Sequence, residues 1–158
     1  MKIKSKQQII EHFISGNKQD QFIGVENEKF LFKKKSNERA DYSDLIKIFN
    51  FFTSKFNWEP IKEDENIIVL KKNGKMITLE PGTQIELSGS QLSNIHEVCS
   101  ESYEFQEKLN LASENFDLKT LSVGFDPFSS IDKIPNNPKQ RYRVMTKEMP
   151  KNGSLSLE

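Results

Sequence analysis

Two glutamates with a spacing of two lie in an otherwise apolar segment near the start of the chain. Glu26 and Glu28 fall within FIGVENEKFLF, residues 22–32, whose alternation predicts a β-strand. Side chains two apart on a strand project from the same face, so we expect the two carboxylates to lie together. Buried acids are costly unless a cation compensates them, and Mg²⁺ prefers carboxylate oxygens. The pair therefore indicates a divalent-cation site, and the alternative is a solvated strand face.

A second polar set lies in ITLEPGTQIELSG, residues 77–89. Its polar side chains alternate with apolar ones, and they would share one face if the Pro-Gly bend in the middle preserves the register. These residues are Thr78, Glu80, Gln84, Glu86 and Ser88. Beside the first pair, the two new carboxylates would make an acidic sheet surface whose members repel one another. Metal ions, and a polyphosphate bound through them, would relieve that repulsion. An acidic outer face without a ligand is the alternative.

Basic partners for such a site come from PKQRYRVM, residues 138–145. Arg141 and Arg143 flank Tyr142 in a stretch that the preceding prolines predict to be extended. Guanidinium groups suit carboxylate or phosphate. We therefore expect these arginines to contact an anion, and the alternative is an exposed basic loop.

Composition narrows the class of protein. The 158 residues carry 23 Lys+Arg and 23 Asp+Glu, and this balance disfavours a nucleic-acid partner. No apolar run approaches the ~20 residues of a membrane helix, so we expect no membrane partner. The first residues lack a secretory signal, and one cysteine cannot form an internal disulfide, which together predict a cytoplasmic location. We expect that cysteine, Cys99, to be a packed thiol on the apolar stripe of a helix.

The order of expected elements is β-α-β-β-β-α-β after a short N-terminal helix. This order predicts an α+β fold with a largely antiparallel sheet and helices on one face. The Asn73-Gly74 pair favours a type I′ hairpin turn. The expected helices begin after Ser5, near Ser43 and at Leu92, and the expected strands are 22–32, 66–71, 75–80, 84–88 and 120–125.

Five motifs in this order resemble the plant and proteobacterial type of glutamate–cysteine ligase. They are GVENEKF, ITLEPGTQIELSG, LSNIHEVCSE, GFDP and PKQRYRVM, and with the closing MPKNGS they span residues 22–153. The resemblance implies an ATP-dependent carboxylate–amine ligase with a glutamine-synthetase-like sheet. Such enzymes join the γ-carboxylate of glutamate to the amine of cysteine through an acyl phosphate, which is the first step of glutathione synthesis. The resemblance implies ATP and Mg²⁺ as cofactors, and glutamate, cysteine and ATP as substrates.

The resemblance also implies roles for the residues that match its motifs. Those expected to bind metal are Glu26, Glu28, Glu80 and Glu86. Those expected to contact substrate are Gln84, Ser88, Arg141 and Arg143. Phe128 in DPFSS stands where the family commonly has a tryptophan, which affects local loop packing rather than the acidic strands.

Length is the largest departure, because members of the family are more than twice as long. We therefore expect residues 1–158 to be the N-terminal, incomplete part of a single catalytic domain, with reduced or absent activity alone. Two alternatives stay open. One is a non-catalytic module that binds an amino acid or nucleotide, and the other is a carboxylate–amine ligase with a different amine acceptor.

Overall fold

The computed structural model describes residues 2–18 and 20–153 and contains a six-stranded antiparallel sheet in the order β2-β3-β4-β5-β1-β6. Because sheet and helices occur together in this order along the chain, the predicted α+β class is confirmed. The strands are β1 Glu26–Lys33, β2 Glu59–Glu63, β3 Asn66–Lys72, β4 Lys75–Glu80, β5 Gln84–Ser88 and β6 Leu118–Leu121.

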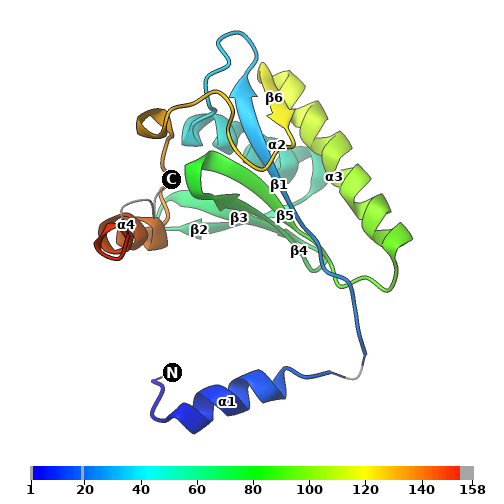
Figure 1. Cartoon of the computed structure of the whole chain (residues 1–158). Helices are drawn as coiled ribbons and strands as arrows, with labels where there is room; N and C mark the ends of the chain where they lie inside the picture. Colours follow the sequence, from blue (N-terminus) through cyan, green and yellow to red (C-terminus); the bar gives the residue numbers. More distant parts are fainter. Residues whose placement is uncertain (1, 19, 154–158) are drawn as a thin grey trace.

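Two long helices cover one face of this sheet, and the other face is left open over its centre (Figure 1). A fourth helix lies beside one end of the sheet, while the first extends away from it. None of the helices in the described part of the chain has the length and hydropathy to cross a membrane. The helices are α1 Lys6–Ser15, α2 Tyr42–Phe56, α3 Ile95–Asn115 and α4 Gln140–Glu148, with short 3₁₀ turns at Pro81–Thr83, Ile131–Lys133 and Met149–Lys151.

The hydrophobic core lies between the sheet and the helix pair α2 and α3. Phe52 is at its centre, with ring centroids 5.3 Å from Phe56, 6.0 Å from Trp58 and 6.5 Å from Phe105. Large rings placed edge to face bury much apolar surface per residue, which lets a chain of modest apolar content form a core. The fully buried aliphatic side chains of this core are Leu31, Leu45, Ile48, Leu70, Ile77, Leu79, Ile85, Leu109 and Leu118.

Several predicted boundaries are confirmed by local chemistry. Helix α2 begins at Tyr42 because Asp41 caps it and exchanges hydrogen bonds with Asp44 in a capping box. The β3–β4 hairpin turns at Asn73 and Gly74, whose φ angles of 48° and 80° are both positive, as a type I′ turn requires. Helix α1 also forms where Ser5 predicts it, but none of its residues is buried.

Other predictions require correction. The segment predicted as extended, PKQRYRVM, contains the start of α4, which begins at Gln140. Strand β2 was not predicted, because its sequence EPIKE is polar and contains a proline. The last strand lies at Leu118–Leu121 rather than 120–125, and the first begins at Glu26 rather than residue 22.

Cys99 is exposed, so the expectation of a packed thiol is wrong. The buried face of α3 instead follows Val98, Phe105, Leu109 and Ala112. Cys99 directly follows Val98, and one residue along a helix turns the side chain by about 100°, which is enough to move it out of the core.

Candidate metal and substrate site on the open sheet face

The two predicted acidic segments lie on neighbouring strands of the sheet. Glu28 on β1 stands opposite Glu86 on β5, and Glu26 stands opposite Ser88. Glu86 in turn stands opposite Thr78 on β4. Because residues opposite each other on antiparallel strands project from the same face, these side chains share one face. The condition that the bend preserves the register is therefore met.

This face is the one that the helices leave open. Along β4 and β5 the acids alternate with Ile77, Leu79, Ile85 and Leu87, which point into the core beneath α2 and α3. Glu80 and Gln84, at the strand ends nearest the bend, are also opposite each other. Along β4 and β5 the sheet thus separates an apolar layer from a polar one, whereas on β1 the buried Phe30 and Phe32 follow Glu28 on the same face.

Glu26 and Glu28 line an open depression on the polar face, and residues 122–124 form its other wall. Partial burial raises the pKa of Glu28, and the nearby negative charges of Glu86, Glu80 and Glu26 raise it further. A cation bound among these carboxylates would reverse the sign of that electrostatic contribution. The face is therefore suited to a positive ligand.

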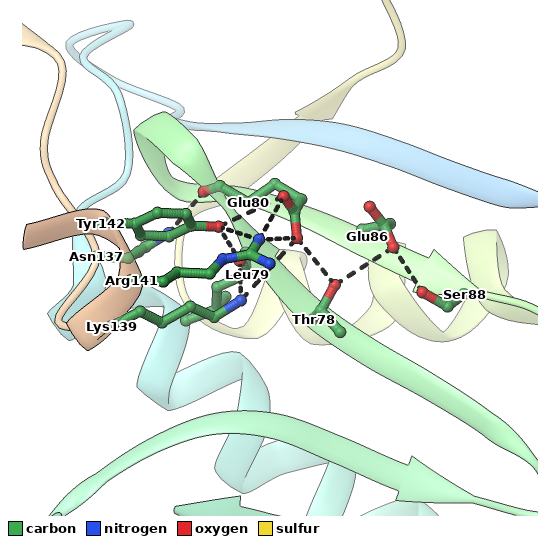
Figure 2. A network of polar contacts seen from close by, with 9 residues as sticks. All are labelled: Thr78, Leu79, Glu80, Glu86, Ser88, Asn137, Lys139, Arg141 and Tyr142. Atoms are coloured by element: carbon green, nitrogen blue, oxygen red, sulfur yellow. Dashed lines mark hydrogen bonds and ion pairs between the residues drawn. The ribbon is translucent and has the colours of Figure 1, made fainter. Parts of the chain in front are cut away.

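Glu86 is the most buried of the four predicted metal ligands, with 7% of its surface exposed. Its Oε1 accepts a hydrogen bond of 2.5 Å from Ser88 Oγ and one of 3.4 Å from Thr78 Oγ1. The Ser88 hydroxyl, which the family resemblance assigns to substrate, is here directed at Glu86. These hydroxyls hold the Glu86 carboxylate in place on the sheet (Figure 2).

Glu80 is held by the C-terminal segment (Figure 2). Arg141 Nη2 lies 3.1 Å from Oε2 and 3.3 Å from Oε1 of Glu80. Lys139 Nζ is 4.0 Å from Oε1. The carboxylate therefore faces two cationic side chains that come from the start of α4.

The same segment is fastened to the backbone of β4. Asn137 Nδ2 donates to the Glu80 carbonyl at 2.6 Å, and Tyr142 Oη donates to the Leu79 carbonyl at 2.9 Å. Lys139 Nζ donates to the same Leu79 carbonyl, and burial lowers the pKa of Lys139. These contacts fix where α4 begins relative to the acidic face.

Arg141 and Arg143 differ in the structure. Arg141 reaches Glu80, while the Arg143 side chain has no polar partner in residues 2–18 and 20–153. Two residues along a helix correspond to a rotation of about 200°, so the two arginines point to opposite sides of α4. The structure brings together seven of the eight predicted site residues and leaves Arg143 apart.

A buried ion pair that sequence reasoning missed closes one end of the site. Arg39 Nη1 lies 2.6 Å from Asp126 Oδ2, and both side chains are more than nine-tenths buried. The Arg39 guanidinium also stacks 4.1 Å from the Phe30 ring centroid and donates to the Gly82 carbonyl at 2.5 Å. Asp126 belongs to the GFDP motif, but no pattern in the sequence singled out Arg39.

The bend between β4 and β5 contains two residues with positive φ. Gly82 has φ 68° and Thr83 has φ 61°, which is unusual for a β-branched residue. Thr83 is fully buried, and its Oγ1 donates to the Ala40 carbonyl at 2.6 Å. The tertiary contacts of Thr83 and Arg39 therefore hold the bend in the form that keeps both strands in register.

The donor set fits Mg²⁺ in its chemistry, because it consists of carboxylate oxygens. Across the described ranges, no three His, Cys, Asp or Glu side chains converge closely enough to hold a metal ion as they stand. Glu80 is turned toward Arg141 and Glu86 toward Ser88. Metal binding at this face would require at least one of these side chains to reorient.

Residues 22–158 match the family described as Glutamate-cysteine ligase family 2 (GCS2). The chain is 38% identical over 156 residues to "Glutamate--cysteine ligase, chloroplastic" of Medicago truncatula, which covers 98% of this chain and 31% of that protein. It is 35% identical to "Glutamate--cysteine ligase A, chloroplastic" of Oryza sativa subsp. japonica, covering 98% of this chain and 32% of the relative.

Two findings follow from these relatives. The chain spans about a third of the length of the curated relatives it matches. The expectation of a cytoplasmic location is contradicted, because these relatives are named chloroplastic. That expectation came from the absence of a secretory signal and a single cysteine, and neither observation distinguishes the cytoplasm from a plastid.

Proposed function

Because the chain belongs to glutamate-cysteine ligase family 2, we propose that it forms part of the active site of an ATP-dependent ligase acting on glutamate and cysteine. The reaction would join the γ-carboxylate of glutamate to the amine of cysteine through an acyl phosphate. The open sheet face would be the part of this site that binds the cation and the acidic substrate. The register pairing of Glu28 with Glu86 is the observation that carries the assignment.

The acidic residues would hold Mg²⁺ on this face. Glu26 and Glu28 would contribute from β1, and Glu80 and Glu86 from β4 and β5. The cation, when bound, would neutralise phosphate charge as the phosphoryl group is transferred. Ser88 and Thr78 would keep the Glu86 carboxylate directed across the open face.

The polar residues at the edges of the face would bind anionic groups. Arg141 would neutralise substrate carboxylate or phosphate, and Gln84 would contribute an amide to the same region. Arg143 lies on the other side of α4, so any contact it makes with substrate would involve a different part of the ligand or of the protein. The GFDP loop is held by the Arg39–Asp126 pair at the end of this face.

Binding experiments on the chain itself test this proposal. Calorimetry with MgCl₂, and with ATP in the presence of MgCl₂, should detect saturable binding to the wild type. The Glu28→Gln/Glu86→Gln variant should bind Mg²⁺ at least about tenfold more weakly, because two of the four charged ligands are lost. Glu107→Gln/Glu114→Gln is the matched control, since it removes two exposed acids from α3 on the other side of the sheet.

Unchanged Mg²⁺ affinity in the double variant would refute the metal assignment. Turnover is tested separately, by following ADP and γ-glutamylcysteine with ATP, Mg²⁺, glutamate and cysteine present. Saturable binding without turnover would favour the alternative of a non-catalytic binding module for the chain taken alone.

A further inference from the structure

The two cationic side chains at Glu80 are held in different ways. Lys139 is buried, with 9% of its side chain exposed, and its Nζ also donates to the Leu79 carbonyl. Arg141 is mostly exposed, with 59% of its side chain accessible. Because the Arg141 guanidinium is accessible to solvent, water can replace its contact with Glu80 more readily than it can replace the buried contact of Lys139. Arg141 Nη2 also donates to Tyr142 Oη at 2.9 Å, a contact that does not involve Glu80.

Arg141 lies against the carboxylate oxygens that a cation would need. Its Nη2 lies within hydrogen-bond distance of both Glu80 oxygens, at 3.1 Å and 3.3 Å. Each oxygen keeps a second lone pair, but a guanidinium charge this close repels a divalent cation bound to the same carboxylate. Arg141 and a divalent cation therefore compete for Glu80.

Anchors elsewhere would keep Arg141 close to the face after it left Glu80. Tyr142, the next residue, is buried and donates to the Leu79 carbonyl at 2.9 Å. Asn137 Nδ2 donates to the neighbouring Glu80 carbonyl at 2.6 Å. The backbone at the start of α4 thus stays in place while the exposed guanidinium turns, and it remains within reach of an anion on the same face.

We propose that Arg141 is an exchangeable counter-ion, which holds Glu80 in the cation-free protein and is released to an anionic ligand when a divalent cation takes that carboxylate. This inference rests on the proposed function, because it requires the acidic face to bind a cation. It adds an order to that binding: the cation first, and then a carboxylate or phosphate group. Lys139 stays in place through the exchange as the fixed counter-charge of Glu80.

The arginine content of the chain makes the exchange directly observable. There are three arginines, Arg39, Arg141 and Arg143, so side-chain NMR of ¹⁵N-arginine-labelled protein gives three guanidinium signals. Conservative Arg141→Lys and Arg143→Lys variants assign them. MgCl₂ should shift the Arg141 signal, and the buried Arg39 signal should stay where it is.

Glu80→Gln is the decisive variant, because it weakens the ion pair without a cation. In this variant the Arg141 signal should already lie near its Mg²⁺-bound position, and MgCl₂ should move it little further. If calorimetry detects Mg²⁺ binding but the wild-type Arg141 signal stays unmoved, the exchange is refuted and the proposed function stands. If no Mg²⁺ binds at all, the proposed metal site itself fails.

A second measurement predicts opposite changes in the affinities for two ligands, Mn²⁺ and glutamate. Arg141→Gln should raise Mn²⁺ affinity, read by the EPR signal of free Mn²⁺, by about twofold to fivefold, because a competitor is removed. If a bound cation releases Arg141 to the carboxylate of glutamate, the wild type should bind glutamate more tightly when Mn²⁺ is present. Arg141→Gln should lose this increase in glutamate affinity. Lys147→Gln is the matched control, since it removes one positive charge from the exposed side of the same helix. Equal effects of the two variants would mean that overall charge, rather than exchange, controls the cation.

Discussion

Glu28 and Glu86 stand directly opposite each other on β1 and β5, on the face of the sheet that the helices leave uncovered. Two segments that are distant in the sequence thereby place like charges side by side. Such a pair costs stability when both groups are ionised, and it becomes favourable when a cation lies between them. The arrangement is therefore understandable as a binding surface rather than as a stabilising feature.

Replacing Glu28 by glutamine should stabilise the cation-free protein at neutral pH by about 0.5 kcal/mol, because one of two opposed charges is removed. The pKa of Glu28 is raised from its ordinary value of 4.5, by partial burial and by the neighbouring acids. A carboxyl with a higher pKa in the folded state makes that state bind more protons, so its ionisation costs stability as the pH rises.

The increase in the free energy of unfolding that Glu28→Gln causes should therefore be small below pH 4.5. It should grow as the pH rises through the raised pKa of Glu28, and then stay constant. Urea unfolding followed by the fluorescence of Trp58, the single tryptophan, measures it. Glu107→Gln, which removes an exposed acid from the middle of α3, is the control for the loss of one negative charge. A variant less stable than wild type at neutral pH would contradict the prediction.

Breaking the buried ion pair should be costly. Asp126→Ala leaves the Arg39 guanidinium buried without its partner, and we expect a loss of about 3 kcal/mol in the free energy of unfolding. Arg39→Met/Asp126→Ala should recover part of that loss, because no unpaired charge remains. Urea unfolding of both variants and of Arg39→Met alone completes the cycle, and a strictly additive double variant would contradict the pairing.

Gly82 and Gly74 provide a matched test of the bend between β4 and β5. Both have positive φ, so alanine should cost about 1 kcal/mol of backbone strain at either site. A Cβ at Gly82 would also come within 2.8 Å of Ile134 Cγ2, whereas one at Gly74 would meet open space. Gly82→Ala should therefore be more destabilising by at least about 1 kcal/mol in thermal unfolding. Equal losses would mean that the contact with Ile134 relaxes freely.

Cys99 should react with a thiol reagent such as dithionitrobenzoate in the native state, because it is exposed on α3. We expect one equivalent to react without denaturant, at a rate within about tenfold of that in urea. Cys99→Ser supplies the blank and should change the free energy of unfolding by less than about 0.5 kcal/mol. Protection of the native thiol by several orders of magnitude would contradict the exposed position.

Local sequence chemistry was a good guide where neighbours in the chain decide the outcome. The type I′ turn at Asn73-Gly74 was predictable because glycine and asparagine tolerate positive φ. The common face of Glu26 and Glu28 follows from strand period alone, and the polar alternation after residue 77 follows from the same rule. The family assignment came from motifs, and their order along the chain can be read without the tertiary structure.

Tertiary structure decided what depends on residues far apart in the chain. The register of β1 against β5 set which carboxylates are opposed, and the contacts of Asn137, Lys139 and Tyr142 with β4 set where α4 begins. No sequence pattern identified Arg39 as a buried ion-pair partner, because the residues that it contacts come from three separate segments. They are Phe30, Gly82 and Asp126. The sequence by itself thus determined the residue types, the strand faces and the family. Only the packed structure decided that Glu80 is paired with Arg141, because that pairing depends on one helix docking beside one strand end.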